Sequence, residues 1–340
     1  ISMLIQKNKN KKKFFKKIFV KICRLFGFEI IDQSTYEVPT LGKKLNEPLS
    51  SPGKVSITIP LGQYKITRKI NSLKIIFRSC TSELIMDQNK KRLFEKDKNE
   101  YTFRSLNSLL KSTILAKKTF NNVHFEFIVT DTNSSKKDLD QIKNILSKYE
   151  INSKLIEINL DNYKKKILGN YSSAKFANMA NLYTSLNLAK NEINDLIYFV
   201  EDDYIHAENS ILEMLFSYEK FSSILKKEVV LLSADYPYLY TKNDDTKIFL
   251  GQQKHWRLVN ESLVTFMTSK DVIIKNFENL MQMATKWEDP WEKPLHEIYK
   301  NVPCFSPIPS LSMHCANINS MFGLPPNFDW VSVWDENKNY

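Results

Sequence analysis

The chain has 340 residues, 42% of them hydrophobic and 12% aromatic, so it is long enough for a substantial core and too apolar to be disordered. Its formal net charge of +11 is concentrated near the start, where the first 24 residues hold nine Lys or Arg and no acidic residue. Because the rest is only mildly basic, the charge indicates no specific nucleic-acid ligand. The four cysteines form no Cys-x-x-Cys pair, and no apolar run approaches the ~20 residues of a membrane span, which predicts a reduced, cytoplasmic protein.

A basic amphipathic arm is predicted over residues 1–32. Its cations lie between apolar residues that recur at helical spacing, namely Phe14, Phe15, Ile18, Phe19, Ile22, Leu25 and Phe26. Such a helix is suited to an anionic membrane surface, which predicts peripheral attachment at the inner face of a membrane. A helix packed on the protein's own core is the alternative. RNA binding is a weaker third reading, because no RNA-recognition fold follows.

Residues 33–72 are rich in Pro, Ser and Thr and predict a connector with a small hairpin at 55–59 and 64–67. From residue 73 onward, strands and helices alternate. Strands are expected at 73–78, 124–129, 155–160 and 196–203, and helices at 103–118, 136–149 and 172–190. This alternation predicts an α/β fold with a mostly parallel central sheet flanked by helices, joined by right-handed crossovers.

After residue 203 the pattern is looser. A helix is expected at 210–225, strands at 229–232 and 262–267, and a second helix at 270–285. Seven prolines follow residue 287, and this density predicts a loop-rich end to the chain.

The stretch 196–203, Leu-Ile-Tyr-Phe-Val-Glu-Asp-Asp, is the most informative one in the sequence. A continuous apolar run of this kind predicts a strand buried on both faces, and ligands bind beyond the carboxyl ends of such strands. Three adjacent carboxylates (Glu201, Asp202 and Asp203) repel one another, so a divalent cation with a phosphate-bearing ligand is expected beside them. The alternative is that Asp202 or Asp203 caps the next helix.

With the following helix, Phe199-Val200-Glu201-Asp202-Asp203-Tyr204 resembles the Glu-Asp-Asp form of the Asp-x-Asp motif in GT-A glycosyltransferases. The likeness is to the N-acetylglucosaminyltransferase I type and to bacterial family-2-like enzymes. It covers roughly residues 73–330 and implies a nucleotide-sugar half at 73–204 and an acceptor half at 205–330, with a tail at 331–340. It also implies that Glu201 or Asp202 contacts the nucleotide and that Asp203 binds Mn²⁺ or Mg²⁺ at the diphosphate.

Four further residues fit the donor side of this resemblance. Asp131 ends the second expected strand, where the family places a base or ribose contact, and Arg78 ends the first. Lys175 and Asn178 lie on the helix before the acidic motif. The alternatives are that Asp131 is an acid in a turn, that Arg78 is a surface cation, and that Lys175 and Asn178 belong to the polar face of their helix.

A second acidic signal is Trp287-Glu288-Asp289-Pro290-Trp291. It resembles the Glu-Asp pair that opens a helix in inverting members, where a carboxylate takes the proton of the acceptor hydroxyl. Asp289 is the predicted base and Glu288 the alternate. Asp289 could equally be the N-cap, with Pro290 as first helical residue. Trp287 is expected to stack on an acceptor sugar, or to be core.

A late histidine and one loop complete the predicted site. His314 fits by position the further metal ligand that several GT-A families take from a histidine, and imidazole suits Mn²⁺ better than Mg²⁺. His255, Trp256 and Arg257 predict an acceptor- or phosphate-facing loop, because Arg binds phosphate through two hydrogen bonds. Asp235 is expected to line the same cleft.

These observations predict a metal-dependent glycosyltransferase that moves a sugar from a nucleotide-sugar donor to a glycan or lipid-linked acceptor, with inversion. One alternative is a metal-dependent nucleotidyl- or phosphotransferase using the same acids. The chain has no Gly-x-x-x-x-Gly-Lys and no Gly-x-Gly-x-x-Gly, which argues against kinases and Rossmann enzymes. The other alternative is a non-catalytic basic adaptor that binds membrane or nucleic acid.

Overall fold

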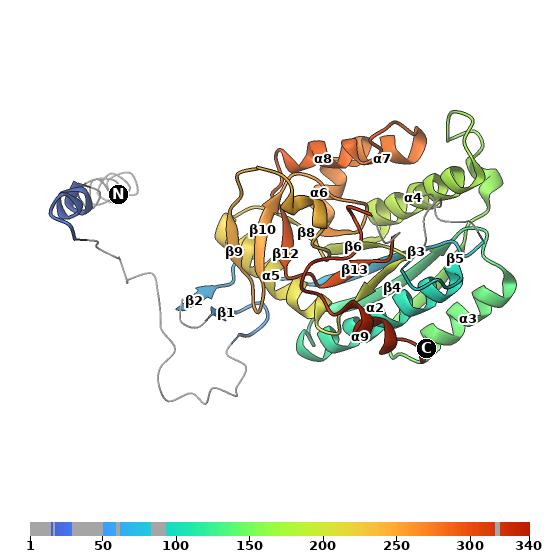
Figure 1. Cartoon of the computed structure of the whole chain (residues 1–340), viewed down its shortest axis with the longest axis horizontal. Coiled ribbons are helices and arrows are strands. Elements are labelled where there is room, and N and C mark those ends of the chain that lie inside the picture. Colours follow the sequence, from blue (N-terminus) through green and yellow to red (C-terminus); the bar gives the residue numbers. More distant parts are fainter. Residues whose placement is uncertain (1–14, 16–17, 29–49, 59–61, 83–92, 317–319) are drawn as a thin grey trace. The chain divides into compact units, whose positions relative to one another are not determined.

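The computed structural model describes residues 15, 18–28, 50–58, 62–82, 93–316 and 320–340 (Figure 1). Contacts divide the chain into one unit of Ile1–Glu47 with Ile57–Gln63 and a second of Pro48–Ser56 with Tyr64–Tyr340. In the first unit, residues 18–25 are helical, as predicted. Residues 1–14, 16–17 and 29–32 of the predicted arm and residues 33–49 of the connector lie outside the described residues. Of the helices in the described ranges, none has the length and hydrophobicity that crossing a membrane requires.

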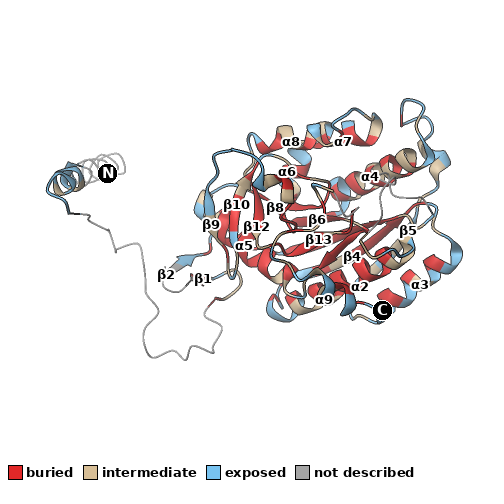
Figure 2. Ribbon diagram, viewed as in Figure 1, coloured by how far each residue is buried: buried red, intermediate tan, exposed pale blue. Residues whose placement is uncertain are grey.

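The second unit is built on a nine-stranded sheet with the order β5-β4-β3-β6-β11-β8-β12-β10-β9. The strands are β3 (Ser72–Ser79), β4 (His124–Asp131), β5 (Asn152–Glu157), β6 (Leu196–Glu201), β8 (Val230–Leu232), β9 (Ile248–Leu250), β10 (His255–Val259), β11 (Phe266–Ser269) and β12 (Cys304–Ile308). All eight residues of β3 are buried, and so are the first five of β6, as the unbroken apolar run of β6 predicts. Figure 2 shows this sheet as the buried centre of the unit.

Most strands of the sheet point the same way. β3 runs parallel to β4 and β6, β4 to β5, and β8 to β12. The two exceptions are β11, which is antiparallel to β6 and β8, and β10, which is antiparallel to β12 and β9. The predicted mostly parallel α/β sheet is therefore confirmed, with two reversed strands in its second half.

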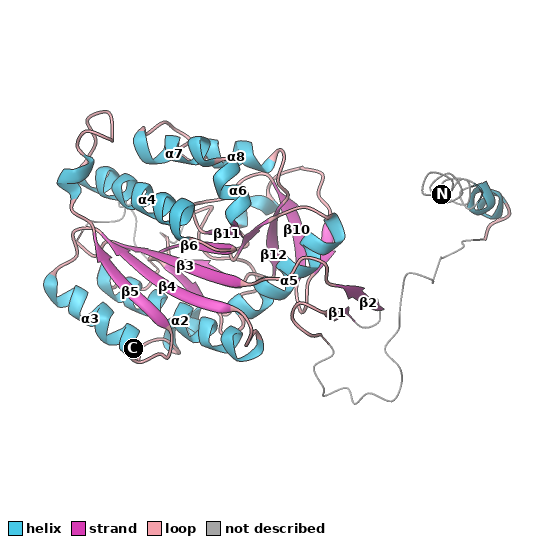
Figure 3. Ribbon diagram, turned by 180° about the vertical axis from the view of Figure 1, so that it is seen from behind, coloured by secondary structure: helices cyan, strands magenta, loops and turns pink. Residues whose placement is uncertain are grey.

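Helices cover both faces of the sheet (Figures 1 and 3). α4 (Ser173–Glu192), α6 (Lys270–Lys275), α7 (Phe277–Thr285) and α8 (Lys293–Tyr299) lie on one side. α2 (Lys98–Thr119), α3 (Lys136–Ser147) and α5 (Ser210–Leu225) lie on the other. The helices and sheet share one large apolar core.

Two small sheets accompany the large one. β1 (Val55–Thr58) pairs with β2 (Gly62–Lys65), where a hairpin was predicted. β7 (Tyr204–His206) follows the acidic motif and pairs antiparallel with β13 (Ser312–His314). A satellite core lies beside this pair, with buried members from α2, β7, β13, the residue after β13 and the last helix, α9 (Trp330–Asp335): Tyr101, Ile205, Met313, Cys315 and Trp334.

Several predicted element boundaries are wrong. The helix expected from residue 103 begins at Lys98, and the strand expected at 262–267 is Phe266–Ser269. The helix expected at 270–285 is two helices separated at Asn276. The segment after residue 287, which was expected to be rich in loops, carries α8, β12, β13 and α9. Proline density misled here, because Pro294 lies in the first turn of α8, where a missing N–H costs nothing.

Candidate active site

A cavity of about 440 Å³ opens beyond the carboxyl ends of β3 and β6. The chain runs from β3 outward to β4 and β5, then returns to place β6 on the other side of β3. Open α/β sheets bind ligands at such a switch point, because the connections leave the neighbouring strand ends in opposite directions. Residues 78–80 at the end of β3 and 201–203 at the end of β6 both line the cavity.

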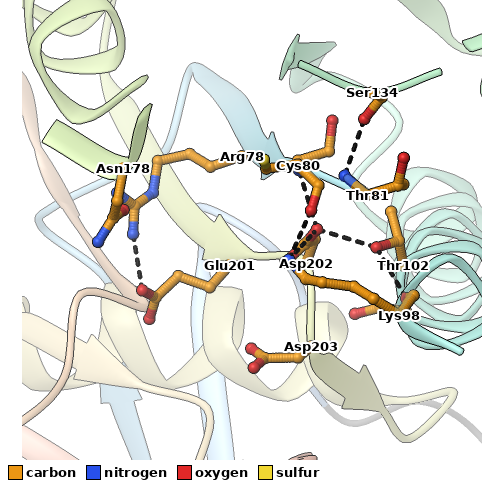
Figure 4. Close-up of polar contacts among 12 residues, drawn as sticks. Arg78, Cys80, Thr81, Lys98, Thr102, Ser134, Asn178, Glu201, Asp202 and Asp203 are labelled. Atoms are coloured by element: carbon orange, nitrogen blue, oxygen red, sulfur yellow. Dashed lines mark hydrogen bonds and ion pairs between the residues drawn. The ribbon is translucent and has the colours of Figure 1, made fainter. Parts of the chain in front are cut away.

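Asp202 is held by the protein itself. Its carboxylate accepts hydrogen bonds from the Cys80 backbone N–H at 3.1 Å and the Thr102 hydroxyl at 2.9 Å, and it pairs with the Lys98 ammonium at 3.0 Å (Figure 4). Burial disfavours the charge on Lys98, but Asp202 and Asp203 outweigh burial and raise its pKa. Asp202 therefore joins the start of α2 to the ends of β3 and β6.

Glu201 turns toward Arg78 and Asn178 (Figure 4). An Arg78 Nη lies 2.9 Å from its carboxylate, and the other Nη donates to the Asn178 amide oxygen at 3.2 Å. Burial raises the pKa of Glu201, Arg78 opposes that shift, and Asp203 adds to it. Arg78 is buried, and its Nε has no hydrogen-bond partner among the described residues, so one donor of a cavity-lining guanidinium remains available to a ligand.

Asp203 and His314 form the third acidic contact. The β7–β13 pairing sets His314 opposite Tyr204, the residue after Asp203, and their rings stack at 4.6 Å. His314 Nδ1 lies 2.9 Å from the Phe322 carbonyl oxygen, so Nδ1–H donates there and Nε2 faces the Asp203 carboxylate at 3.3 Å. Burial lowers the pKa of His314, but Asp203 and Glu201 outweigh burial, and the net shift is upward.

The charge of this cavity suits a divalent cation. In the described part of the chain, five carboxyl groups line it against two permanent cations, Arg78 and Lys98. The Asp203 oxygen and the His314 Nε2 are ligand types that Mn²⁺ accepts. No group of three or more His, Cys, Asp or Glu side chains within the described ranges is arranged to hold a metal. The chain thus offers two ligands, and a diphosphate and water would have to supply the others.

The segment 287–292 forms another wall, to which Trp287, Asp289, Pro290, Trp291 and Glu292 all contribute. The two indole rings stack at 4.8 Å, and Trp291 is anchored by a 2.9 Å hydrogen bond from its Nε1 to the Met283 carbonyl. The Trp287 Nε1 donates to Asp289 at 3.1 Å. α8 begins at Lys293, with Glu292 at the N-cap position, so Asp289 is not the cap of this helix.

Glu292 and Lys98 line the cavity but were not singled out in the sequence. Burial, with Glu201 and Asp289 adding to it, raises the pKa of Glu292 to about 7. The only feature of the sequence that points to Glu292 is its position directly after Trp291. The helix that it precedes was predicted to start at Pro290, whereas α8 starts at Lys293. Lys98 was hidden because α2 begins five residues before the predicted helix.

Three predicted residues lie near this cavity without lining it. Asp131 is buried, and it accepts from Ser79 and Ser134, each at 2.6 Å, so its carboxylate closes the turn after β4. The Lys175 ammonium lies over the Trp287 ring, 4.3 Å from its centroid. Glu288 points to solvent and pairs with Lys286.

The predicted acceptor loop lies elsewhere. Trp256 is fully buried on β10, and its Nε1 donates to Glu213 at 3.2 Å. Arg257 pairs with the buried carboxylate of Asp235, and His255 is exposed at the start of the strand. None of these four lines the cavity. Three strands separate β10 from β6, and Asp235, which follows β8, pairs with Arg257 on β10.

The capping interpretation of the acidic motif does not hold. β7 follows Asp203 directly, and the next helix, α5, begins at Ser210 with Asn209 at its N-cap position. Asp202 and Asp203 are only 7% and 9% exposed, and both line the cavity.

The proteins to which this chain is similar are found among solved structures. No family model matches the chain, and no curated protein matches it. Among solved structures it is similar to S. aureus TarS 1–349, with 13% identity over 68% of this chain and 57% of that one, at a TM-score of 0.38. It is also similar to the galactosyltransferase LgtC with donor and acceptor sugar analogs (9% identity, 78% and 95% of the two chains, TM-score 0.36). The UTP-bound UGPase from Acinetobacter baumannii gives 8% identity over 79% and 92%, at a TM-score of 0.39.

Proposed function

We propose that the chain is a metal-dependent glycosyltransferase that moves a sugar from a nucleotide-sugar donor to a glycan or lipid-linked acceptor, with inversion. One observation carries this proposal. A single cavity at the strand switch point brings the Asp203–His314 pair together with the carboxyl groups of Asp289 and Glu292 and an apolar Trp287–Trp291 stack. Such a transfer requires a cation site for the diphosphate, a carboxylate that accepts the proton of the acceptor hydroxyl, and a flat apolar surface for the sugar ring.

Asp203 and His314 would hold Mn²⁺ or Mg²⁺. The cation supplies Lewis-acid stabilisation of the negative charge that builds on the leaving nucleoside diphosphate. Arg78 adds an unpaired Nε–H toward the same anionic ligand. Asp289 and Glu292 offer carboxylates to the acceptor hydroxyl, and the paired indoles offer a flat apolar surface to its sugar ring.

A thermal-shift panel tests this proposal. UDP, GDP, CDP and ADP are each added to the full chain with and without Mn²⁺, and one of them should raise the melting temperature only when the metal is present, because only ligands of the folded state stabilise it. Asp203→Ala and His314→Ala should each abolish that shift, whereas Glu288→Ala, a change on the exposed neighbouring loop, should keep it. No metal-dependent shift with any nucleotide would overturn the proposal.

Product analysis separates the rival enzyme class. With the matching nucleotide sugar, the proposed enzyme releases a nucleoside diphosphate and forms a glycoside. A nucleotidyltransferase using the same acids would instead release pyrophosphate from a nucleoside triphosphate.

For the arm, we propose attachment to an anionic lipid bilayer. Ile18, Phe19, Ile22 and Leu25 are exposed, and at 3.6 residues per turn they fall within an arc of about 120°. Lys21 and Arg24 lie outside this arc, so one side of the helix is apolar and the other cationic. Each such cation near an anionic surface contributes about 1 kcal/mol.

Vesicle sedimentation tests the attachment. The chain should bind vesicles that contain phosphatidylglycerol, bind pure phosphatidylcholine much less, and detach as salt rises. Phe19→Glu with Ile22→Glu should remove binding, and Val331→Glu, an exposed site on the second unit, should not. Equal binding by the arm variant would contradict the proposal, and binding to RNA with equal strength would favour the adaptor alternative.

A further inference from the structure

Glu292 differs from the other carboxyl groups of the cavity in having no partner on another described residue, because the hydrogen bond that its carboxyl group accepts comes from its own backbone N–H. It lies one residue before α8, and its side chain lines the cavity. Among the described residues, no other side chain donates a hydrogen bond to its carboxyl group or forms an ion pair with it. A half-buried carboxyl group that faces a cavity and is bound to no other residue is placed to act on a ligand rather than to support the fold.

The other four cavity carboxylates are each occupied. Asp202 is surrounded by Lys98, Thr102 and the Cys80 N–H. Glu201 contacts Arg78, and Asp203 contacts His314. Asp289 accepts from the Trp287 indole, which ties it to the wall.

The charges that face Glu292 come from three directions. Glu201 at the end of β6 and Asp289 in its own segment disfavour its ionised form, while His314 on β13 favours it. Burial is the largest effect, and the result is a pKa of about 7. A carboxyl group with such a pKa can accept a proton near neutral pH and release it again, which Asp or Glu in water does poorly.

We propose that Glu292 is the catalytic base of the transfer reaction, a role the sequence had suggested for Asp289. This rests on the proposed function. The acceptor oxygen forms its bond to the anomeric carbon while the bond from that carbon to the diphosphate oxygen breaks, and the electron pair of that bond leaves with the nucleoside diphosphate. The acceptor's hydroxyl proton passes to the Glu292 carboxylate. The indole stack that precedes Glu292 in the chain orients the acceptor ring beside it.

The test compares Glu292→Gln with Asp289→Asn and with Glu288→Gln, all in the full chain. The donor is the nucleotide sugar whose nucleoside diphosphate gives the metal-dependent thermal shift, and the acceptor is drawn from a panel of p-nitrophenyl glycosides. Glu292→Gln should lower kcat by about 10²–10⁴-fold, the usual contribution of a general base. It should leave the dissociation constant of the nucleoside diphosphate within about threefold of the parent value. Asp289→Asn should lose less than about tenfold, and Glu288→Gln, on the exposed neighbour, should lose nothing.

A pH profile supplies a second readout that a structural role would not move. The parent kcat/KM should rise with pH through an acid limb as Glu292 ionises, and the residual activity of Glu292→Gln should lack this limb. Retention of a third or more of kcat by Glu292→Gln, or loss of nucleoside diphosphate binding in that variant, would overturn the role of Glu292. Failure of the parent chain itself to bind any nucleoside diphosphate would overturn the proposed function instead.

Discussion

Glu201, Asp202 and Asp203 are neighbours in the sequence, yet each carboxylate meets a different kind of group. The Arg78 guanidinium contacts Glu201, and the His314 imidazole faces Asp203. Asp202 pairs with the Lys98 ammonium and accepts two further hydrogen bonds, from a backbone N–H and a hydroxyl. The strand ends after Glu201, so the three side chains diverge instead of sharing one face (Figure 4). The middle residue thereby supports the fold, and the outer two face the cavity contents.

Asp202→Ala should lower the free energy of unfolding by about 3–5 kcal/mol, because it leaves the buried ammonium of Lys98 without its carboxylate. Urea denaturation measures this loss. Asp202→Ala combined with Lys98→Met should recover part of it, since no buried charge is then left unpaired. Asp289→Ala, on the 287–292 wall, is the control and should cost under about 1 kcal/mol. A cost that small for Asp202→Ala would contradict the structural role.

Glu292→Gln should stabilise the protein more at pH 8 than at pH 5. The unfolded chain loses the Glu292 proton near its ordinary pKa of about 4.3, whereas the folded chain keeps it up to a pKa of about 7. Between these values the unfolded state binds fewer protons, so the contribution of Glu292 to stability falls as pH rises and stays low above pH 7. Glutamine does not titrate and removes that loss. Melting temperatures of both proteins at pH 5 and pH 8 measure the difference, and an equal difference at the two pH values would contradict it.

At the level of elements, α4 is tied to two strand ends by one side chain. The Asn181 amide donates to the backbone oxygen of Thr130 at 2.8 Å and to that of Ser79 at 3.3 Å, and its own oxygen accepts from the Thr130 hydroxyl at 2.7 Å. This contact fixes the helix over the carboxyl ends of β3 and β4, directly beside the cavity that Asn181 also lines.

Asn181→Ala should lower the free energy of unfolding by about 1–3 kcal/mol, because buried polar groups lose their partner. It should also weaken metal-dependent nucleoside diphosphate binding, since the cavity wall loosens. Asn187→Ala is the matched control on the same helix, where the amide only donates to the Tyr183 carbonyl one turn earlier. Equal stability of the two variants in urea would show that Asn181 does not hold the helix.

The elements of the first half of the chain were largely predictable, whereas in the second half the predictions held for α5 and β8 but not for most of the later elements. Long apolar runs such as the one in β6 are specific to a strand covered on both faces. No local sequence pattern predicts that β11 and β10 run antiparallel to their neighbours, because strand direction depends on pairing across the sheet. Short elements such as β9 and β13 carry too few residues for a hydrophobic period to be recognised.

The residues of the candidate site were also predictable only in part. The acidic motif could be found because ligands bind beyond the carboxyl ends of buried parallel strands, and His314 was singled out by its position in the family that the sequence resembles. Asp235 and Arg257 also follow or lie in strands, but those strands lie toward the far edge, so the two residues pair with each other instead. Placing them needed the strand order, which only the folded structure gives.

For the whole molecule, the segment 329–340 is part of the fold rather than a loose tail. Trp334 is 4% exposed, its ring stacks on Phe94 at 3.8 Å, and the Arg104 guanidinium lies 4.1 Å from its ring centroid. Arg104 also donates to the Trp334 carbonyl at 2.8 Å, and Tyr340 donates to Glu100 at 2.6 Å. The segment therefore covers the outer side of α2, the helix whose first turn carries Lys98.

Trp334→Ala should cost about 3–5 kcal/mol of unfolding free energy, as expected when a buried tryptophan is removed from a packed cluster. Val331→Ala, in the same short helix but 46% exposed, should change stability by less than about 0.5 kcal/mol. Urea unfolding curves of the two variants measure this contrast. Similar midpoints for both would mean that α9 contributes nothing to the core.

The distance along the chain between α2 and its cover has a consequence for synthesis on the ribosome. Arg104 and Trp334 are 230 residues apart, and at roughly 5–20 residues per second translation of that interval takes on the order of ten seconds or more. During that time Tyr101 and its apolar neighbours on the nascent chain lack their final partners. The satellite core packs against β13 and is completed only after residue 334 has been synthesised. Because β13 places His314 beside Asp203, the cavity is assembled late in the synthesis and folding of the protein.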